Sequence, residues 1–363
     1  MNSLRILFTV FAVFVMSSSV GAIEGQRQVF PALSGQEGAR LVIHAATDLE
    51  AMRPLILDFQ ETAPDLAVDV TDYVTNDLFR EAQKACADGG RSGDILLSSS
   101  VDQLVRLAND GCAQAHRPLP TSRIKDWANW RDEVFGFTFE PVVFVYDRSK
   151  VPSEDVPDSH EALVDLLRRN PLRYHGRIGT YDIEASGVGY LLAFNDSRQA
   201  PTTYGRLIES VSRAAPVIRC CNNEVLGELS SGAVRIAYNV LGSYAYAAAR
   251  LDPDLGIVVP RDYTLILSRG AMIPKTAANP ALGQRFLDYL LSERGRAVAR
   301  EKSFFFAEGK PMPPGVDGPD DLMASGVGRP IRIGPSLLAA QDDIQRRHFI
   351  GDWKRLIRND VKR

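Results

Sequence analysis

Two long extended stretches, each with a proline inside, constrain the fold of this chain more than any other feature. They cover residues 135–146 and 256–267 and are rich in aromatic and β-branched side chains. Because proline cannot donate a ladder hydrogen bond, it is rare inside the central strands of a sheet. Such stretches suit a chain that passes from one lobe to another. We therefore expect two crossings, near residues 137–142 and 259–264, which bracket a separate middle lobe.

Strand-like and helix-like segments alternate on both sides of the first crossing. Before it, short apolar strands alternate with amphipathic helices, at 41–45, 49–62, 67–70, 77–87, 94–97 and 101–109. After it, helices and strands continue at 160–169, 177–181, 188–195, 233–238 and 241–251, and two helices at 282–291 and 293–301 return to the first lobe. This alternation predicts an α/β fold with largely parallel sheets.

Length and composition agree with two lobes. A chain of 363 residues exceeds the roughly 250–300 residues that usually share one core. Hydrophobic residues make up 45% and charged residues 24%, which is typical of a globular protein. The net charge of −3 lacks the basic excess of nucleic-acid binders, so no nucleic-acid partner is expected. We expect lobe one to comprise residues 39–138 plus 263–363, and lobe two residues 139–262.

Residues 1–22 have the pattern of a secretory signal peptide. Arg5 precedes an apolar run from Ile6 to Met16, and small residues ending in Ala22 follow. The apolar run is shorter than the ~20 residues that a membrane-spanning helix needs, so an uncleaved anchor is the weaker interpretation. We expect cleavage after Ala22 and export of a soluble chain.

The four cysteines become informative in an exported chain, because disulfides persist in oxidising compartments. Cys86 and Cys112 each lie near the end of a predicted helix, and we expect them to form a disulfide rather than to remain free thiols. Cys220 and Cys221 are adjacent. Metal binding by this pair is disfavoured, because no histidine lies near and ligands usually come at wider spacing. A vicinal disulfide and two buried thiols both remain open.

Four polar loops stand between a strand and the start of a helix, at residues 45–48, 98–100, 184–187 and 239–243. Ligands of α/β proteins bind outside the carboxyl ends of the strands. Helix starts there expose unpaired N–H groups and a partial positive charge, which suits a phosphate or a carboxylate. Each serine or threonine could instead be a simple helix cap. Convergence of four loops from two lobes favours a binding site.

An enzymatic function finds little support. The sequence has no nucleophile-elbow, zinc-protease or phosphate-loop motif, and no cofactor is expected. Of the five histidines, only His44, in the first predicted strand, is expected near a site. A single histidine on a strand is more often a hydrogen-bonded core residue than a base or a metal ligand.

The whole mature chain resembles the type II periplasmic solute-binding proteins of ABC transporters, in the ferric-ion-binding branch. It is most similar to the subgroup of the phosphoglycerate-transport regulatory protein and the hexose-phosphate-binding proteins. The stretches that carry the resemblance are 94–100, 176–182, 186–190, 238–244 and 259–264. It implies a two-lobed fold with two extended hinge crossings, a periplasmic location and a ligand held between the lobes.

The resemblance also implies which residues bind the ligand. Family members use loops after the first strands, and the iron-binding branch holds an anion on a Ser-Gly-x helix start with a nearby asparagine. Transferred to this sequence, the implied ligand-binding residues are Ala46, Thr47, Ser98, Ser99, Ser100, Tyr181, Ser186, Gly187, Val188, Asn239, Gly242 and Ser243.

One departure from the family argues against ferric iron. The iron-binding branch places a tyrosine pair shortly after the asparagine, where this chain has Val240 and Leu241, and tyrosines follow only at Tyr244 and Tyr246. Ferric iron needs hard oxygen ligands, which valine and leucine lack. We therefore expect no metal site, and instead a small anionic organic solute, a phosphate ester or a carboxylate. The expected partner of the monomeric chain is an ABC-type permease or a two-component histidine kinase; ferric-ion binding is a further alternative.

Overall fold

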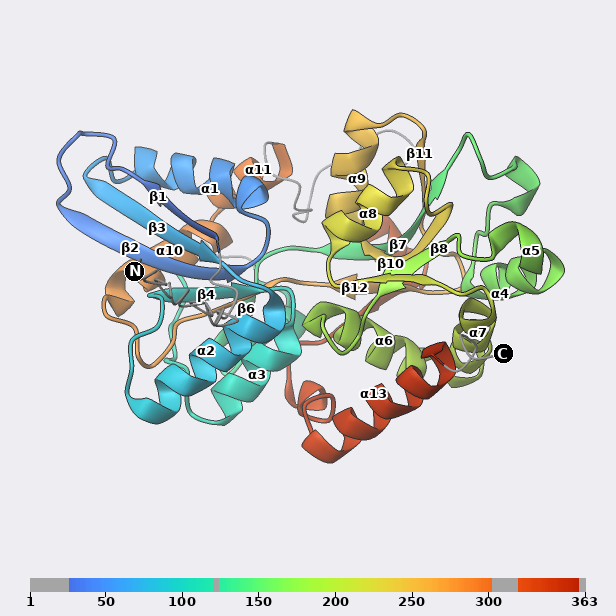
Figure 1. Cartoon of the computed structure of the whole chain (residues 1–363). Helices are drawn as coiled ribbons and strands as arrows, with labels where there is room; N and C mark the ends of the chain where they lie inside the picture. Colours follow the sequence, from blue (N-terminus) through green and yellow to red (C-terminus); the bar gives the residue numbers. More distant parts are fainter. Residues whose placement is uncertain (1–25, 120–123, 302–318, 359–363) are drawn as a thin grey trace, which may run out of the picture.

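The computed structural model describes residues 26–119, 124–301 and 319–358, so the predicted signal peptide lies outside the described residues. Two separate sheets lie side by side, each covered by helices on both faces (Figure 1). This arrangement confirms the predicted two-lobed α/β fold. Within the described ranges, no helix is both long and apolar enough to cross a membrane.

The first sheet has the strand order β1-β3-β2-β4-β13-β6-β5. Strands β2, β3 and β4 run parallel to one another, as the alternating pattern predicted. The strand bounds are β1 Gln26–Phe30, β2 Ala39–Ala46, β3 Leu66–Asp72, β4 Ile95–Ser98, β5 Asn129–Trp130, β6 Val134–Gly136 and β13 Gly270–Met272. The sheet is covered by α1 Leu49–Glu61, α2 Thr75–Asp88, α3 Val101–Asn109, α10 Pro280–Leu291 and α11 Glu293–Glu301. Strand β1 falls in a polar stretch that gave no strand signal.

The second sheet has the order β14-β12-β7-β10-β8-β9, and β11 pairs with the end of β7. Its strands are β7 Glu140–Asp147, β8 Ile178–Tyr181, β9 Val217–Arg219, β10 Ile236–Leu241, β11 Leu255–Val258, β12 Thr264–Leu267 and β14 Gly328–Pro330. Its helices are α4 His160–Arg169, α5 Pro171–Tyr174, α6 Gly187–Gln199, α7 Pro201–Arg213, α8 Asn222–Ser230, α9 Gly242–Leu251, α12 Pro319–Ala324 and α13 Asp343–Arg358. Helices α8 and α9 cover one face, and α6, α7 and α13 the other (Figure 1).

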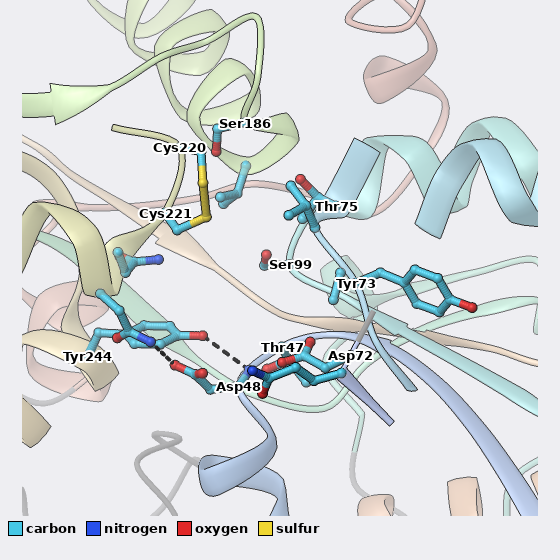
Figure 2. A pocket seen from close by; sticks show the side chains of 16 residues that line it. Thr47, Asp48, Asp72, Tyr73, Thr75, Ser99, Ser186, Cys220, Cys221 and Tyr244 are labelled. Atoms are coloured by element: carbon cyan, nitrogen blue, oxygen red, sulfur yellow. Dashed lines mark hydrogen bonds between the residues drawn. A yellow bond between two sulfur atoms is a disulfide. The ribbon is translucent and has the colours of Figure 1, made fainter. Parts of the chain in front are cut away.

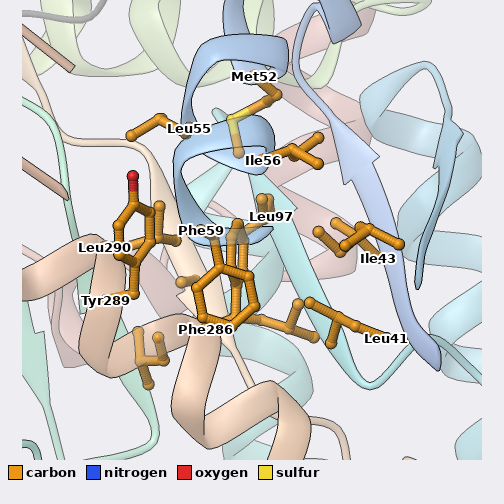
Figure 3. Packing of buried hydrophobic residues seen from close by; sticks show 14 of the residues in the cluster. Leu41, Ile43, Met52, Leu55, Ile56, Phe59, Leu97, Phe286, Tyr289 and Leu290 are labelled. Atoms are coloured by element: carbon orange, nitrogen blue, oxygen red, sulfur yellow. The ribbon is translucent and has the colours of Figure 1, made fainter. Parts of the chain in front are cut away.

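The core of the first lobe lies between β2, β3 and the helices α1 and α10 (Figure 3). Phe59 of α1 packs edge-to-face on Phe286 of α10, with ring centroids 4.9 Å apart, and both side chains are buried. Gly283 permits a close approach of α10 to the segment before β4, because a Cβ there would lie 2.1 Å from the Asp94 carbonyl oxygen. Truncation of a phenylalanine in such a core costs about 3–5 kcal/mol.

Within the described ranges, two short crossings join the lobes. The first runs from β6 to β7 through residues 137–139, within the predicted stretch. The second runs from β12 to β13 through residues 268–269, a few residues beyond the predicted stretch at 259–264. The two crossings lie side by side, because the Phe137 N–H donates to the Arg269 carbonyl and the Arg269 N–H donates to the Thr138 hydroxyl.

The structure corrects the predicted boundaries of the C-terminal part of lobe one, residues 263–363. Strands β12 and β14 belong to the second sheet, and α13 packs against α7. The physical reason is an apolar face on α13, where Ile350, Trp353 and Ile357 are buried in the core of the second lobe. The stretch from β13 to α11 returns to the first lobe, and the short helix Pro335–Leu338 packs against α3 of that lobe.

The predicted disulfide between Cys86 and Cys112 is confirmed, with Cα atoms 5.6 Å apart. It joins the end of α2 to the segment that follows α3. A cross-link that closes a loop of this length stabilises a fold by about 3 kcal/mol in the chain-entropy estimate.

Candidate functional site

A cavity of about 300 Å³ lies between the two lobes (Figure 2). Both lobes contribute to its wall. The lining residues are Gln26, Ala46, Thr47, Asp48, Asp72, Tyr73, Val74, Thr75, Ser99, Ser186, Val188, Cys220, Cys221, Asn222, Asn223 and Tyr244.

The first lobe supplies its part of the wall from the carboxyl ends of three parallel strands. Thr47 and Asp48 follow β2, Asp72 ends β3, and Ser99 follows β4. Parallel strands direct their carboxyl ends to the same edge of a sheet, so the side chains that follow them meet there. Thr75 begins α2 at the same edge.

The second lobe supplies its part from three helix starts. Ser186 is the N-cap of α6, and its hydroxyl accepts a hydrogen bond from the Gly189 N–H at 3.1 Å. Residues 220–223 cover the turn after β9 and the start of α8, and Tyr244 lies in the first turn of α9. All three helices start after strands of the second sheet, on the side that faces the first lobe (Figure 1).

The charge of the lining is negative. Asp48 and Asp72 are its ionisable carboxylates, and no lysine or arginine is among the described residues that line the cavity. Burial raises the pKa of the Asp72 carboxyl to about 7, and the nearby Asp48 charge adds to the rise. Backbone hydrogen bonds from Thr47 and Leu49 lower this pKa in part.

A buried ion pair lies directly behind the cavity wall. The Arg269 Nε atom lies 2.5 Å from the Glu140 carboxylate, and both side chains are almost fully buried. The same guanidinium donates to the Thr47 hydroxyl and lies 5.0 Å from the centre of the Tyr244 ring. Its positive charge is therefore compensated by Glu140 before it can act on a ligand.

Several hydrogen bonds cross from one lobe to the other around the cavity. The Asn223 amide donates to the Asp48 carboxylate at 2.5 Å. The Asn76 amide donates to the carbonyl oxygens of Glu184 and Ala185, at 3.1 and 2.8 Å. These contacts hold the lobes against each other on two sides of the cavity.

The structure places five of the predicted ligand-binding residues on the cavity wall: Ala46, Thr47, Ser99, Ser186 and Val188. The other seven do not line it: Ser98, Ser100, Tyr181, Gly187, Asn239, Gly242 and Ser243. All seven are buried, and most have polar contacts within the protein. The Ser98 hydroxyl accepts from the Ser100 N–H at 3.1 Å, and the Tyr181 hydroxyl donates to Asn222.

Gly187 makes a close approach, but to the other lobe. A Cβ at this position would lie 2.6–2.8 Å from side-chain atoms of Ser100, Gln103 and Thr75, all from the first lobe. The Gly187 N–H donates to the Thr75 hydroxyl at 2.9 Å. In this conformation the helix start expected to hold an anion therefore has protein hydroxyls as partners.

Asn239 and Ser243, expected to donate to a ligand, each donate to a buried carboxylate. The Asn239 amide donates to Asp196 at 2.8 Å, and Asn239 has a backbone φ of 64°. The Ser243 hydroxyl donates to Glu140. The sequence could not reveal these contacts, because both acceptors lie more than forty positions earlier in the chain.

His44 does not line the cavity. Its Nδ1 atom accepts a hydrogen bond from the Gly93 N–H at 3.2 Å, and its ring packs edge-on against Tyr73. Burial lowers the pKa of the His44 imidazole. The histidine is a hydrogen-bonded part of the lobe-one sheet.

Sequence reasoning missed residues 72–75 and 220–223, which form much of the wall. The sequence pattern could have indicated both segments, because each leads from a strand into the start of a helix, as the four selected loops do. Residues 72–75 lead from β3 into α2, and residues 220–223 lead from β9 into α8. The structure also resolves the question left open for Cys220 and Cys221, which form a vicinal disulfide. Glu224 lies close to both sulfurs, but thiolates rather than disulfide sulfurs are metal ligands.

Comparisons with known proteins agree with this architecture. The sequence model of the family described as bacterial extracellular solute-binding protein matches residues 41–305. A search of curated proteins finds no match. The substrate-binding protein of an ABC transporter from Agrobacterium tumefaciens is 35% identical, with a TM-score of 0.85, over 92% of this chain and 98% of that one.

More distant solved structures share the fold alone. The periplasmic binding protein AfuA from Actinobacillus pleuropneumoniae, with exogenous fructose-6-phosphate bound, has a TM-score of 0.69 at 15% identity, over 89% of this chain and 99% of that one. Iron-bound HitA from Pseudomonas aeruginosa has a TM-score of 0.67 at 17% identity, over 84% and 99%.

Proposed function

The chain belongs to the bacterial extracellular solute-binding proteins, and from that premise we propose that it captures a small polar solute for an ABC-type transporter. The partner is the membrane permease of that transporter, as the description of the Agrobacterium relative suggests. The signal peptide predicted at residues 1–22 is removed, and the mature protein acts as a monomer in the periplasm.

The observation that carries this proposal is the interlobe cavity, whose wall comes from both lobes. A solute that contacts Thr47 and Asp48 on one side and Ser186 and Asn223 on the other makes its full set of contacts only when the lobes are closed. A ligand shifts such an equilibrium only through its higher affinity for one state. Capture and closure are therefore coupled, and a permease can recognise the loaded form.

The charge of the solute is the finer part of the proposal. The sequence favoured an anion, a phosphate ester or a carboxylate. The lining is itself negative, because Asp48 and Asp72 stand in the wall while Arg269 is paired with Glu140. Like charges at short distance in a partly dry cavity repel by several kcal/mol. We therefore favour a neutral solute rich in hydroxyl groups, or one with a positive group, over an anion.

The same lining is a poor binding site for ferric iron, because its two tyrosines are not placed as iron ligands. Figure 2 shows the Tyr73 hydroxyl pointing away from Asp48 and Asp72. The Tyr244 hydroxyl lies 3.3 Å from the Arg269 guanidinium and accepts a hydrogen bond from the Asp48 N–H at 3.4 Å. Burial raises the pKa of the Tyr244 hydroxyl, which disfavours the ionised oxygen that ferric iron needs as a ligand.

A thermal-shift screen tests the proposal, because a ligand that binds only the native state raises the melting temperature. The panel contains glucose, glucosamine, thiamin, ethanolamine, putrescine, fructose 6-phosphate, 3-phosphoglycerate and ferric citrate. We expect a saturable shift with a neutral or cationic member. A shift with the phosphates alone restores the anionic solute, and no shift with any member contradicts solute binding of this kind.

Two variants on one strand assign the shift to the cavity. Asp72→Asn removes a charge from the wall and should weaken the binding of a cationic solute about tenfold or more. Asp69→Asn, on the same strand β3, removes a carboxylate that pairs with Arg27 outside the cavity and should leave the affinity unchanged.

A further inference from the structure

The disulfide between Cys220 and Cys221 forms part of the cavity wall, and nothing in the proposed function requires it. Both cysteines are half-buried and line the cavity. Figure 2 shows the bond beside Ser186 at one end of the cavity, whereas Asp48 and Asp72 lie at the other end. The Cys86–Cys112 disulfide, in contrast, does not line the cavity.

The turn that carries the disulfide is fixed on both sides. The Cys220 N–H donates to the Glu224 carboxylate at 3.1 Å. The Asn222 side-chain oxygen accepts from the Leu241 N–H at 3.0 Å and from the Tyr181 hydroxyl. Asn223 reaches across to the first lobe. The sulfur atoms are thus held at a defined place in the wall rather than on a loose loop.

The two ends of the cavity differ in chemistry. A disulfide has no hydrogen-bond donor, and its sulfur is a polarisable, largely apolar surface. Ala46, Val74 and Val188 add apolar side chains to the lining of the cavity. Asp48 and Asp72 offer only acceptors when they are ionised. The cavity therefore suits a molecule with a non-polar face and a separate group that donates hydrogen bonds.

We propose that the Cys220–Cys221 disulfide is a solute-contacting surface that selects cyclic solutes with a C–H or aromatic face. The ring of the solute packs on the sulfur pair, and its hydroxyl or ammonium groups point to Asp48 and Asp72. This inference rests on the proposed function, since it concerns the solute of the same cavity. It adds a class of solute, ring-shaped and with donors on one side, which the charge of the wall alone does not define.

The test compares ring-shaped and open-chain members of the panel on four proteins. The ring-shaped probes are glucose, glucosamine, thiamin and fructose 6-phosphate, and the open-chain probes are ethanolamine, putrescine, 3-phosphoglycerate and ferric citrate. The variants are Cys220→Ser/Cys221→Ser, Cys220→Ala/Cys221→Ala and the matched control Cys86→Ser/Cys112→Ser, which removes the other disulfide. Circular dichroism checks that each variant is folded, and calorimetric titration gives the dissociation constants.

We expect the wild type to bind a ring-shaped probe and the serine pair to bind it roughly three- to tenfold more weakly, as expected for a lost sulfur–ring contact. The alanine pair keeps an apolar surface and should lose less. The control should bind like the wild type.

Two outcomes overturn the inference while solute binding stands. Either the wild type binds only open-chain probes, or both the serine pair and the alanine pair bind a ring-shaped probe as well as the wild type does. If the serine pair does not fold, the alanine pair decides in the same way. No binding of any probe by the wild type overturns the proposed function and this inference together.

Discussion

Glu140 and Asp196 are both fully buried carboxylates, and the protein compensates them in different ways. Glu140, at the start of β7, forms an ion pair with Arg269 and accepts a hydrogen bond from the Ser243 hydroxyl. Arg269 also donates to Thr47 in the cavity wall. The Glu140 network thus contains residues of both lobes, of a crossing and of the wall itself.

Asp196, on α6, is surrounded by uncharged donors of the second lobe. The Asn239 amide donates to it at 2.8 Å and the Tyr263 hydroxyl at 3.1 Å, and the Tyr238 hydroxyl donates as well. Burial raises the pKa of the Asp196 carboxyl, and the nearby His160 and the three donors offset the rise only in part. None of these residues lines the cavity.

The difference separates two tasks that one sequence pattern could not distinguish. The Glu140 network connects the hinge to the cavity, so its loss should affect both stability and solute binding. The Asp196 network holds the second lobe together, so its loss should affect stability alone. Each of the following changes tests this division.

The largest effect is expected for Arg269→Met. The substitution keeps a long apolar side chain but leaves Glu140 buried without its cation, which typically costs 3–5 kcal/mol, so we expect a loss of about that size. Urea unfolding measures the loss in the free energy of unfolding. Solute affinity should fall too, because Thr47 loses the donor that orients its hydroxyl.

A double variant is the control for this prediction. Glu140→Gln combined with Arg269→Met removes both charges, so it should cost less than the sum of the two single variants. A loss below about 1 kcal/mol for Arg269→Met alone would show that water reaches Glu140 and that the hinge pair is not truly buried.

Asn239→Ala is the corresponding change in the other network. Asp196 loses one donor, and alanine must adopt a φ of 64°, so we expect a loss of about 1–3 kcal/mol. Asn239→Gly removes the same amide but relieves the backbone, and should cost less. Solute affinity should stay within about twofold of the wild type. A larger loss of affinity in both variants would make Asn239 a ligand donor, as the sequence first suggested.

Asn239 and Ser243 show how much of the site could be predicted from the sequence. The strands and helices followed from periodicity, and helix α3 begins and ends where it was expected. Asn239 within β10 and Ser243 at the start of α9 fitted a ligand-binding pattern. Their real acceptors, Glu140 and Asp196, are joined to them only by the folding of distant segments, which local pattern does not contain.

The C-terminal boundary failed for a similar reason. An amphipathic helix such as α13 shows that it has a face to bury, but not which lobe will cover it. In contrast, the cavity wall at Asp72 was within reach of the reasoning, because the rule about strand ends applies to β3 as it does to β2. The loop after β3 was not among the four loops selected from the sequence, although the same physical rule applies to it.

Asp72 offers an intermediate case, because its carboxylate lies in the cavity wall and is stabilised by backbone hydrogen bonds from Thr47 and Leu49 and by the nearby charge of Arg269. Its pKa of about 7 lies above the ordinary value of 3.8, so the unfolded chain releases this proton at lower pH than the folded protein. Stability should therefore fall as the pH rises from about 4 to about 7, and level off above that. Because water in the cavity screens the charge, we expect a contribution on the order of 1 kcal/mol.

The matched variant for this pH dependence is Asp72→Asn, which has no proton to release. Urea unfolding of both proteins across this pH range should give curves that converge at the acid end and separate toward neutrality. Curves that remain parallel would mean that Asp72 titrates in the folded protein as it does in the unfolded chain. Asp72 would then count as a solvated carboxylate, unlike Glu140 and Asp196.

The smallest effect is expected at Asn223, which bonds to Asp48 across the mouth of the cavity. The Asn223 side chain is exposed, so water replaces the lost partner in Asn223→Ala, and the free energy of unfolding should fall by less than about 1 kcal/mol. The bond exists only when the lobes touch, so its loss should shift the open–closed equilibrium and weaken solute binding by up to about fivefold.

Asn76→Ala is the matched control for cross-lobe contact, since the Asn76 amide also bridges the lobes but does not line the cavity. If both variants weaken the solute equally without a loss of stability, closure itself is the cause. If only Asn223→Ala does so, Asn223 contacts the solute. A loss above about 2 kcal/mol in either variant would place the surface contacts in the same class as the buried networks, and the division between hinge and lobe interior would no longer hold.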